Sequence, residues 1–138
     1  MANLKPSERI LCAIDSTNVA QASTLAATLS SDVGGIKLGL EFFGANGPQG
    51  YKEVIKANQN IFLDLKLHDI PNTVAKTVHS LMRLHPKIMT IHTAGGYAMM
   101  VSAANAATKD EAQARCPSPF IVSGTILTRL DEADLNAI

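Results

Sequence analysis

The stretch Asn60-Ile61-Phe62-Leu63-Asp64-Leu65-Lys66-Leu67-His68-Asp69-Ile70-Pro71-Asn72-Thr73 joins a strand pattern to a helix start. An apolar run opens it, and Pro71-Asn72 near its end is typical of a first helical turn. Side chains alternate between the two faces of a strand, so Asp64 and Lys66 are expected to point the same way. Buried charge costs free energy unless it is paired, and even paired charge rarely improves stability. An acid and an ammonium together at a strand end therefore indicate chemistry rather than core packing.

Five short apolar runs with few charges recur along the chain, and each has the composition of a buried β-strand. The predicted strands cover residues 10–14, 35–39, 60–64, 88–91 and 120–126. Stretches whose apolar residues recur at helical spacing lie between the strands. The predicted helices are a first from Ser16 or Thr17 to Leu29, a second over 49–57, a third from 71 to before Pro86, a fourth over 98–108 and a fifth from 131 onward. This alternation predicts a parallel sheet with right-handed crossovers.

Two α/β architectures fit this alternation, an open doubly wound sheet and a (β/α)8 TIM barrel. No GxGxxG loop follows the first predicted strand, which weakens the dinucleotide-binding version of the open sheet. Several polar residues fall in or just after predicted strands, where barrel enzymes carry their chemistry. These residues are Asp15, Lys37, Asp64, Lys66, His92 and Thr128. We therefore predict a (β/α)8 barrel.

The 138 residues form a single partial barrel domain in this interpretation. A barrel of roughly 250 residues spends about 31 residues on each βα unit. Residues 1–138 therefore supply about the first five units, truncated before the last strands. Two apolar strand edges would then be unpaired, which is an aggregation hazard. We expect these residues to be the N-terminal portion of a longer enzyme, and a polypeptide of them alone to be nearly inactive and poorly soluble.

The composition argues against several classes of partner. Twelve basic and twelve acidic residues cancel, which disfavours a nucleic-acid or membrane surface as the main partner. The apolar runs are shorter than the roughly 20 residues of a membrane span, and the N-terminus lacks the apolar core of a signal peptide. Cys12 is expected to be a small buried hydrophobe and Cys116 to lie on a loop, without the spacing of a disulfide framework or a zinc site. We predict a cytoplasmic protein.

The charged candidate residues each have a structural alternative. Asp64, Lys66 and Asp69 could form a structural ion-pair cluster, but their place at a strand end favours a site. Lys37 lies inside an apolar run, so its ammonium either extends to solvent along its alkyl stem or points inward and pairs with Asp64. Asp15 closes the first strand and could only cap the following helix.

The histidines and glycines give weaker signals. His92 ends the fourth predicted strand, and a hydrogen-bonded structural role competes with a role as a base. His68, His79 and His85 show no ligand spacing and are interpreted as surface or structural residues. Gly95-Gly96 before a helix could favour an anion through its backbone N–H groups, although tight turns explain most such pairs.

The chain resembles the bacterial type of the orotidine 5′-monophosphate decarboxylase family over essentially its whole length. The most specific element is the Asp-x-Lys-x-x-Asp stretch within residues 62–73, quoted above. Supporting matches are Ala13-Ile14-Asp15, Ile36-Lys37-Leu38-Gly39, Ile91-His92-Thr93-Ala94-Gly95-Gly96 and Thr125-Ile126-Leu127-Thr128. The resemblance implies decarboxylation of orotidine 5′-monophosphate to uridine 5′-monophosphate in de novo pyrimidine biosynthesis, with no metal and no cofactor.

The resemblance also implies roles for the residues around the reaction centre. Lys66 would protonate C6 of the pyrimidine as carbon dioxide leaves. Asp64 would lie beside the substrate carboxylate and orient the two lysines. Lys37 would bridge Asp64 and the ribose hydroxyls.

The remaining implied roles concern substrate binding and assembly. Asp15 would contact the ribose, and Thr128 would hydrogen-bond the pyrimidine. Asp69 and Thr73 would cross the interface of a homodimer into the neighbouring site, where Asp69 completes an alternating Lys-Asp-Lys-Asp array.

Two alternatives stay open. Related sugar-phosphate decarboxylases and aldolases share the Asp-x-Lys-x-x-Asp strand, but they use magnesium and have an acidic residue on the second strand. Lys37 occupies that place here and favours the metal-free reaction. The other alternative is an inactive fragment that acts only by association with another chain.

Overall fold

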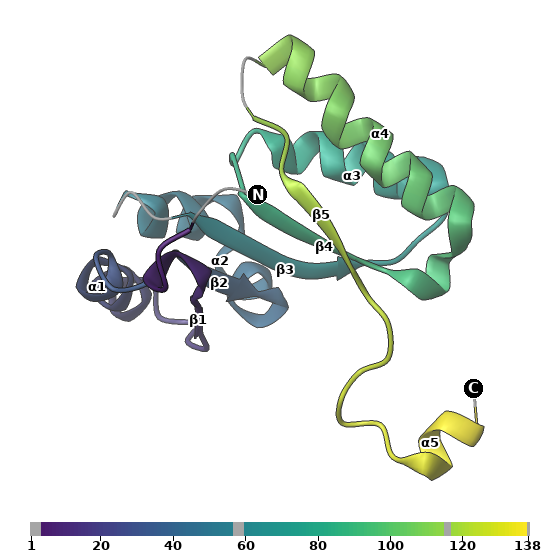
Figure 1. Cartoon of the computed structure of the whole chain (residues 1–138), viewed down its shortest axis with the longest axis horizontal. Helices are drawn as coiled ribbons and strands as arrows, with labels where there is room; N and C mark the ends of the chain where they lie inside the picture. The colour runs from purple at the N-terminus through teal and green to yellow at the C-terminus, as the bar shows by residue number, and fades with distance from the viewer. Residues whose placement is uncertain (1–3, 57–59, 115–116, 138) are drawn as a thin grey trace.

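The computed structural model describes residues 4–56, 60–114 and 117–137 and contains one parallel sheet (Figure 1). Neighbouring strands follow the order of the chain, β1-β2-β3-β4-β5, and every pairing is parallel. The strands are β1 (Leu11–Ile14), β2 (Gly35–Gly39), β3 (Ile61–Leu67), β4 (Ile88–His92) and β5 (Phe120–Gly124).

The strand order distinguishes the two architectures that the sequence left open. A doubly wound sheet reverses its strand order at a switch point, whereas a barrel adds each strand beside the one before it. The order here never reverses. The predicted barrel arrangement is therefore confirmed, and the chain contributes five consecutive βα units to it.

Helices cover one face of the sheet, with α1 packed beside α2 and α3 beside α4 (Figure 1). They are α1 (Val19–Leu29), α2 (Leu40–Ile55), α3 (Pro71–Met82) and α4 (Gly96–Ala114), and a short α5 (Glu132–Asn136) follows the last strand. Two 3₁₀ turns, Ser7–Arg9 and Thr93–Gly95, precede β1 and α4. No helix in the described ranges is long and apolar enough to cross a membrane.

The core lies between the sheet and the helices. Alternate strand residues point to this side because the side-chain period of a strand is two. Ile36, Leu38, Leu63, Met89 and Ile91 are all buried there.

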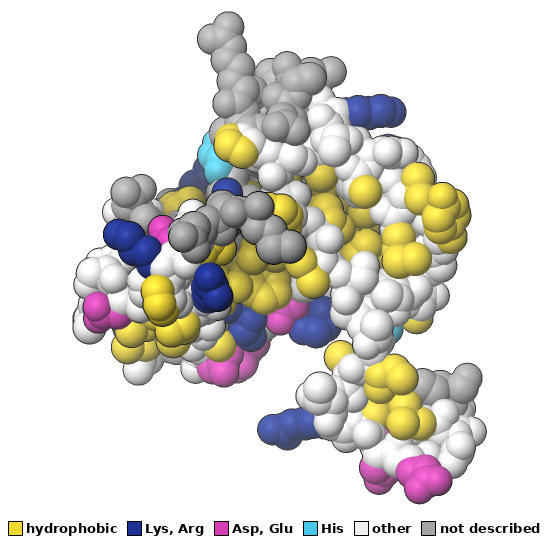
Figure 2. Space-filling view, in the orientation of Figure 1, with side chains coloured by type: hydrophobic (Ala, Val, Ile, Leu, Met, Phe, Trp, Pro, Cys, Tyr) yellow, Lys and Arg dark blue, Asp and Glu magenta, His cyan; other side chains and the backbone are white. Residues whose placement is uncertain are grey.

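The opposite face of the sheet is open. Leu11 on β1 and Phe120 and Val122 on β5 are exposed although all three are apolar. Figure 2 shows hydrophobic side chains gathered over the middle of this view. The strand composition predicted burial on both faces of the sheet, but only the face under the helices is covered here. In a barrel the inner face is buried by strands on the opposite side of the barrel, and the five described strands do not close around to cover it. The predicted unpaired apolar edges are confirmed, since β1 and β5 are the outer strands of the described sheet.

Helix α2 begins nine residues before the predicted start at Gln49 and ends at Ile55. Glycine and proline usually interrupt helices, so Gly44, Gly47 and Pro48 give no local signal for a helix before Gln49. The structure instead joins two helical pieces at Gly47, whose φ of 57° lies in the left-handed region that glycine tolerates. Pro48 follows in the first turn of the second piece, where its missing N–H costs no hydrogen bond.

Smaller differences concern strand ends and a cap. β3 continues three residues beyond the predicted end at Asp64, and it thereby includes Lys66. The cap of α1 is Asn18, whose Oδ1 accepts from the Gln21 backbone N–H at 2.9 Å, rather than Ser16 or Thr17.

The two cysteines have separate outcomes. Cys12 is half-buried in β1 rather than buried as predicted, because β1 is an outer strand of the described sheet. The prediction for Cys116 lies outside the described residues.

Candidate active site

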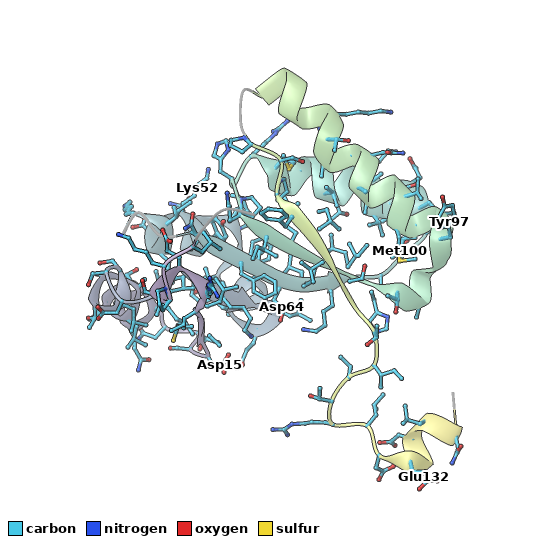
Figure 3. The ribbon with its side chains drawn as sticks, viewed as in Figure 1. Asp15, Lys52, Asp64, Tyr97, Met100 and Glu132 are labelled. Carbon is cyan, nitrogen blue, oxygen red and sulfur yellow. The ribbon has the colours of Figure 1, made fainter. Side chains whose placement is uncertain are left out.

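Strand register places the predicted charged residues on the open face of the sheet. Lys37 on β2 is level with Phe62 on β3, and Gly39 is level with Asp64. The strand period of two puts Asp64 on the same face as Phe62, opposite to the buried Leu63. Figure 3 shows Asp64 beside the sheet and Asp15 at the end of β1.

One carboxylate lies between two ammonium groups. Lys66 Nζ donates to Asp64 Oδ1 at 2.8 Å and to Oδ2 at 2.9 Å. Lys37 Nζ lies 3.7 Å from Asp64 Oδ2. The inward orientation of Lys37 is therefore observed, and the three charges leave one net positive charge on the open face.

The electrostatics of Asp64 favour its ionised form. Its side chain is only 12% exposed, and this burial raises the pKa of the carboxyl. Hydrogen bonds from Lys66 and Thr90, together with the charges of Lys66 and Lys37, outweigh burial and lower the pKa below its ordinary value. Asp64 is thus a fixed anion that holds both ammonium groups in place.

Thr90 is a site residue that the sequence analysis missed. It lies in the middle of β4 and donates from Oγ1 to Asp64 Oδ1 at 2.8 Å. Threonine is common in strands, so the residue type alone carries no functional signal. The available signal was a hydroxyl inside the apolar run Ile88-Met89-Thr90-Ile91, where a buried polar group needs a partner.

The histidines near the site have structural contacts. His92 Nδ1 accepts from the Ala94 backbone N–H at 3.1 Å and so caps the 3₁₀ turn Thr93–Gly95. The His92 ring stacks on His68 with centroids 5.2 Å apart and an interplanar angle of 20°. These contacts favour the structural interpretation of His92 over a role as a base.

Four other predicted site residues have no hydrogen bond or ion pair with Asp64 within the described part of the chain. Asp15 is exposed directly after β1. Asp69 Oδ1 accepts from the Ile70 backbone N–H at 2.7 Å. Thr73 is exposed in the first turn of α3, and Thr128 lies in an exposed turn after β5. The structure therefore brings together Lys37, Asp64 and Lys66 but not Asp69, the fourth member of the predicted array.

The side chains around Asp64 do not resemble the ligands of a metal centre. Among residues whose placement the structure describes, no three His, Cys, Asp or Glu side chains are grouped closely enough to hold a metal ion. Asp64, the acid at the centre of the site, already interacts with two ammonium groups, which repel cations.

A family model described as "Orotidine 5′-phosphate decarboxylase / HUMPS family" matches residues 8–136. The chain belongs to this family. The resemblance drawn from the sequence is thereby confirmed.

Curated relatives named orotidine 5′-phosphate decarboxylase are similar to nearly the whole chain. The relative from Rhodospirillum rubrum is 49% identical over 127 residues, which are 91% of this chain and 51% of that protein. The relative from Sphingopyxis alaskensis is 49% identical over 129 residues, which are 94% of this chain and 54% of that protein. The chain thus spans about half the length of the curated relatives it matches.

Solved structures of the decarboxylase family have the same fold. The crystal structure of orotidine 5′-phosphate decarboxylase from Lactobacillus acidophilus aligns with a TM-score of 0.82 and 32% identity. That alignment covers 92% of this chain and 57% of the other. The crystal structure of the enzyme of the same name from Pyrococcus horikoshii aligns with a TM-score of 0.67 and 18% identity. That alignment covers 83% of this chain and 50% of the other, and at this identity it shows a similar fold alone.

Proposed function

We propose that the protein containing this chain decarboxylates orotidine 5′-monophosphate to uridine 5′-monophosphate without a metal or cofactor. The observation that carries this proposal is the Asp64 carboxylate between the Lys37 and Lys66 ammonium groups. Family membership supports the same reaction class. We place the reaction in de novo pyrimidine biosynthesis in the cytoplasm.

The proposed reaction breaks the bond between C6 of the pyrimidine and its carboxylate carbon. Carbon dioxide leaves, and the electron pair of that bond stays on C6 as a carbanion. The Lys66 ammonium donates a proton to C6 and regains one from solvent. Asp64 accepts two hydrogen bonds from the Lys66 ammonium and so keeps it directed toward the reacting carbon.

A fixed ammonium stabilises the carbanion by electrostatics. At about 4 Å and an effective dielectric constant near 20, the attraction is on the order of 4 kcal/mol, or roughly a thousandfold in rate. That contribution does not account for the whole acceleration that such enzymes need. Binding of the ribose and phosphate must also position the substrate and close the site.

The other predicted residues complete the proposed site in a homodimer. Asp15 contacts the ribose, and Thr128 hydrogen-bonds the pyrimidine. Asp69 and Thr73 reach into the neighbouring protomer's site, and Asp69 there supplies the second acid of the alternating array. The exposure of all four side chains is compatible with contacts to a substrate or to a second copy.

Replacement of Lys66 tests the proposed chemistry. In the complete polypeptide that contains these residues, Lys66→Ala should lower kcat by about a thousandfold or more, because it removes the proton donor and the nearer positive charge. Loss of absorbance by orotidine 5′-monophosphate measures turnover, and circular dichroism checks folding. Lys56→Ala is the matched control, because Lys56 forms an exposed ion pair with Glu53 away from the site. A folded Lys66→Ala protein that keeps most of the activity would exclude the assignment.

A metal-dependent sugar-phosphate reaction is the second candidate, because the matching family description includes the HUMPS group. The cation Lys37 on β2 disfavours it, since the resemblance implies an acid at that place for magnesium binding. A chelator added to the active protein distinguishes the two reactions. Unchanged turnover supports the metal-free decarboxylase, whereas loss of activity that magnesium restores supports the alternative.

A further inference from the structure

Thr90 is buried, with 6% of its surface exposed, although it lies on the open face of the sheet with Asp64. On β4 it alternates with Met89 and Ile91, whose side chains point to the opposite face, into the core. A hydroxyl removed from water in such a place costs free energy unless it is hydrogen-bonded. The Thr90 hydroxyl therefore needs hydrogen-bond partners at this position.

The Thr90 hydroxyl links the backbone of one site residue to the side chain of another. The Lys66 backbone N–H donates to Thr90 Oγ1 at 2.8 Å. Thr90 Oγ1 in turn donates to Asp64 Oδ1 at 2.8 Å. A hydroxyl has one proton and two acceptor lone pairs, so donation to the carboxylate leaves Oγ1 to accept from the amide. Both bonds together fix the orientation of the hydroxyl.

The backbone at Lys66 requires such a partner. The register between β3 and β4 shifts between Leu63 and Leu67, so Lys66 lies in an irregular part of the ladder. Its φ of 49° is in the left-handed region, which is unfavourable for a residue other than glycine. The Thr90 side chain supplies the acceptor for the Lys66 N–H in this irregular segment.

The same hydroxyl also sets the rotation of the Asp64 carboxylate. Oδ1 accepts from Thr90 and from Lys66 Nζ, whereas Oδ2 is the oxygen nearest Lys37. Lys66 Nζ is almost equidistant from the two oxygens, at 2.8 and 2.9 Å, so its bonds alone do not fix the plane of the carboxylate. The bond from Thr90 to one oxygen therefore helps to fix that plane, with the other oxygen toward Lys37.

We propose that Thr90 is a positioning residue for the decarboxylation, because it holds the Asp64 carboxylate and the Lys66 backbone in the geometry that directs the Lys66 ammonium. This inference rests on the proposed function. Thr90 itself acts through Asp64 and Lys66.

Two substitutions in the complete polypeptide separate the hydroxyl from its surroundings. Thr90→Val keeps the branched shape and removes the hydroxyl, whereas Thr90→Ser keeps the hydroxyl and removes a methyl group. We expect Thr90→Val to lower kcat by about ten- to a hundredfold, the effect of one lost hydrogen bond to a charged group, with KM changed by less than about threefold. Thr90→Ser should keep kcat within about threefold. Equal losses in both variants, or no loss in Thr90→Val, would overturn the positioning role.

A second measurement does not depend on turnover. Titration of the Asp64 carboxyl carbon by ¹³C NMR should show a higher midpoint in Thr90→Val than in the parent, because the ionised form loses a hydrogen-bond donor. Thr90→Ser should keep the parent midpoint. An unchanged midpoint in Thr90→Val would overturn the inference, whether or not the protein decarboxylates its substrate. If the parent protein shows no turnover but the midpoint is still higher in Thr90→Val than in the parent, the proposed function would be overturned and the hold of Thr90 on Asp64 would still be supported.

Discussion

At the scale of single residues, Asp64 organises the site because two ammonium groups and a hydroxyl converge on its carboxylate. The pairing of Asp64 with Lys66 could be predicted from the strand period alone. The inward direction of Lys37 was one of two alternatives, because a lysine stem is long enough to reach solvent from an apolar strand. The contact with Thr90 could not be predicted, because it depends on the register between β3 and β4.

Asp64 should also make stability depend on pH. Its pKa is lower in the folded chain than its ordinary value, so the unfolded chain binds this proton more tightly. The stabilising contribution is therefore present above the unfolded pKa of about 4 and is lost as the pH falls through the lower, folded pKa.

Denaturant unfolding of the complete polypeptide between about pH 2 and pH 6 measures this dependence. The free energy of unfolding should fall toward acid pH in the parent. It should fall less in Asp64→Asn, which has no carboxyl to titrate at this position. The same slope in both proteins would contradict the assignment of this effect to Asp64.

At the scale of elements, local signals placed the helices and strands well but misplaced several ends. The start of α3 at Pro71 follows from the preference of proline for a first helical turn. The early start of α2 could not be predicted, because Gly44, Gly47 and Pro48 are typical of a loop. Packing of Phe42 and Tyr51 against the core outweighs those local preferences.

Tyr51 on α2 gives a test of packing at this scale. Its side chain is fully buried, and its hydroxyl finds no hydrogen-bond partner within the described residues. Burial also raises the pKa of Tyr51, so the hydroxyl stays neutral. Tyr51→Phe removes this unsatisfied group and should increase the free energy of unfolding by about 1 kcal/mol.

Thermal and denaturant unfolding measure this change. Val54→Ala, at a buried position on the same helix, is the matched control and should instead lower the free energy of unfolding by about 2 kcal/mol. A loss of stability in Tyr51→Phe would show that the hydroxyl has a partner.

At the scale of the whole molecule, the open face of the sheet distinguishes this chain from a closed barrel. The outer strands β1 and β5 expose Leu11, Phe120 and Val122. After β5 the chain leaves the sheet, and α5 lies apart from the other helices (Figure 1). A polypeptide of residues 1–138 alone therefore exposes both an apolar face and two strand edges.

We predict that such a 138-residue polypeptide self-associates and has no measurable turnover of orotidine 5′-monophosphate. Unpaired edges with apolar side chains favour edge-to-edge contact, and a charge on an edge strand opposes it. Val122→Lys should therefore reduce the association seen by sedimentation velocity. Leu25→Lys is the matched control, because Leu25 is an exposed leucine on α1, away from the sheet. A monomeric, active parent polypeptide would refute this prediction. An equal reduction of association by Val122→Lys and Leu25→Lys would refute it as well.

The sequence by itself determined the alternation of strands and helices, the pairing of Asp64 with Lys66, and membership of the decarboxylase family. These depend on local periodicity and on short motifs, which are independent of how distant segments meet. Only the tertiary structure decided that the strands lie in sequential order, that Lys37 turns toward Asp64, and that Thr90 bonds to both neighbouring site residues. Thr90 and Asp64 are 26 residues apart, so their contact exists only because parallel pairing places β3 beside β4.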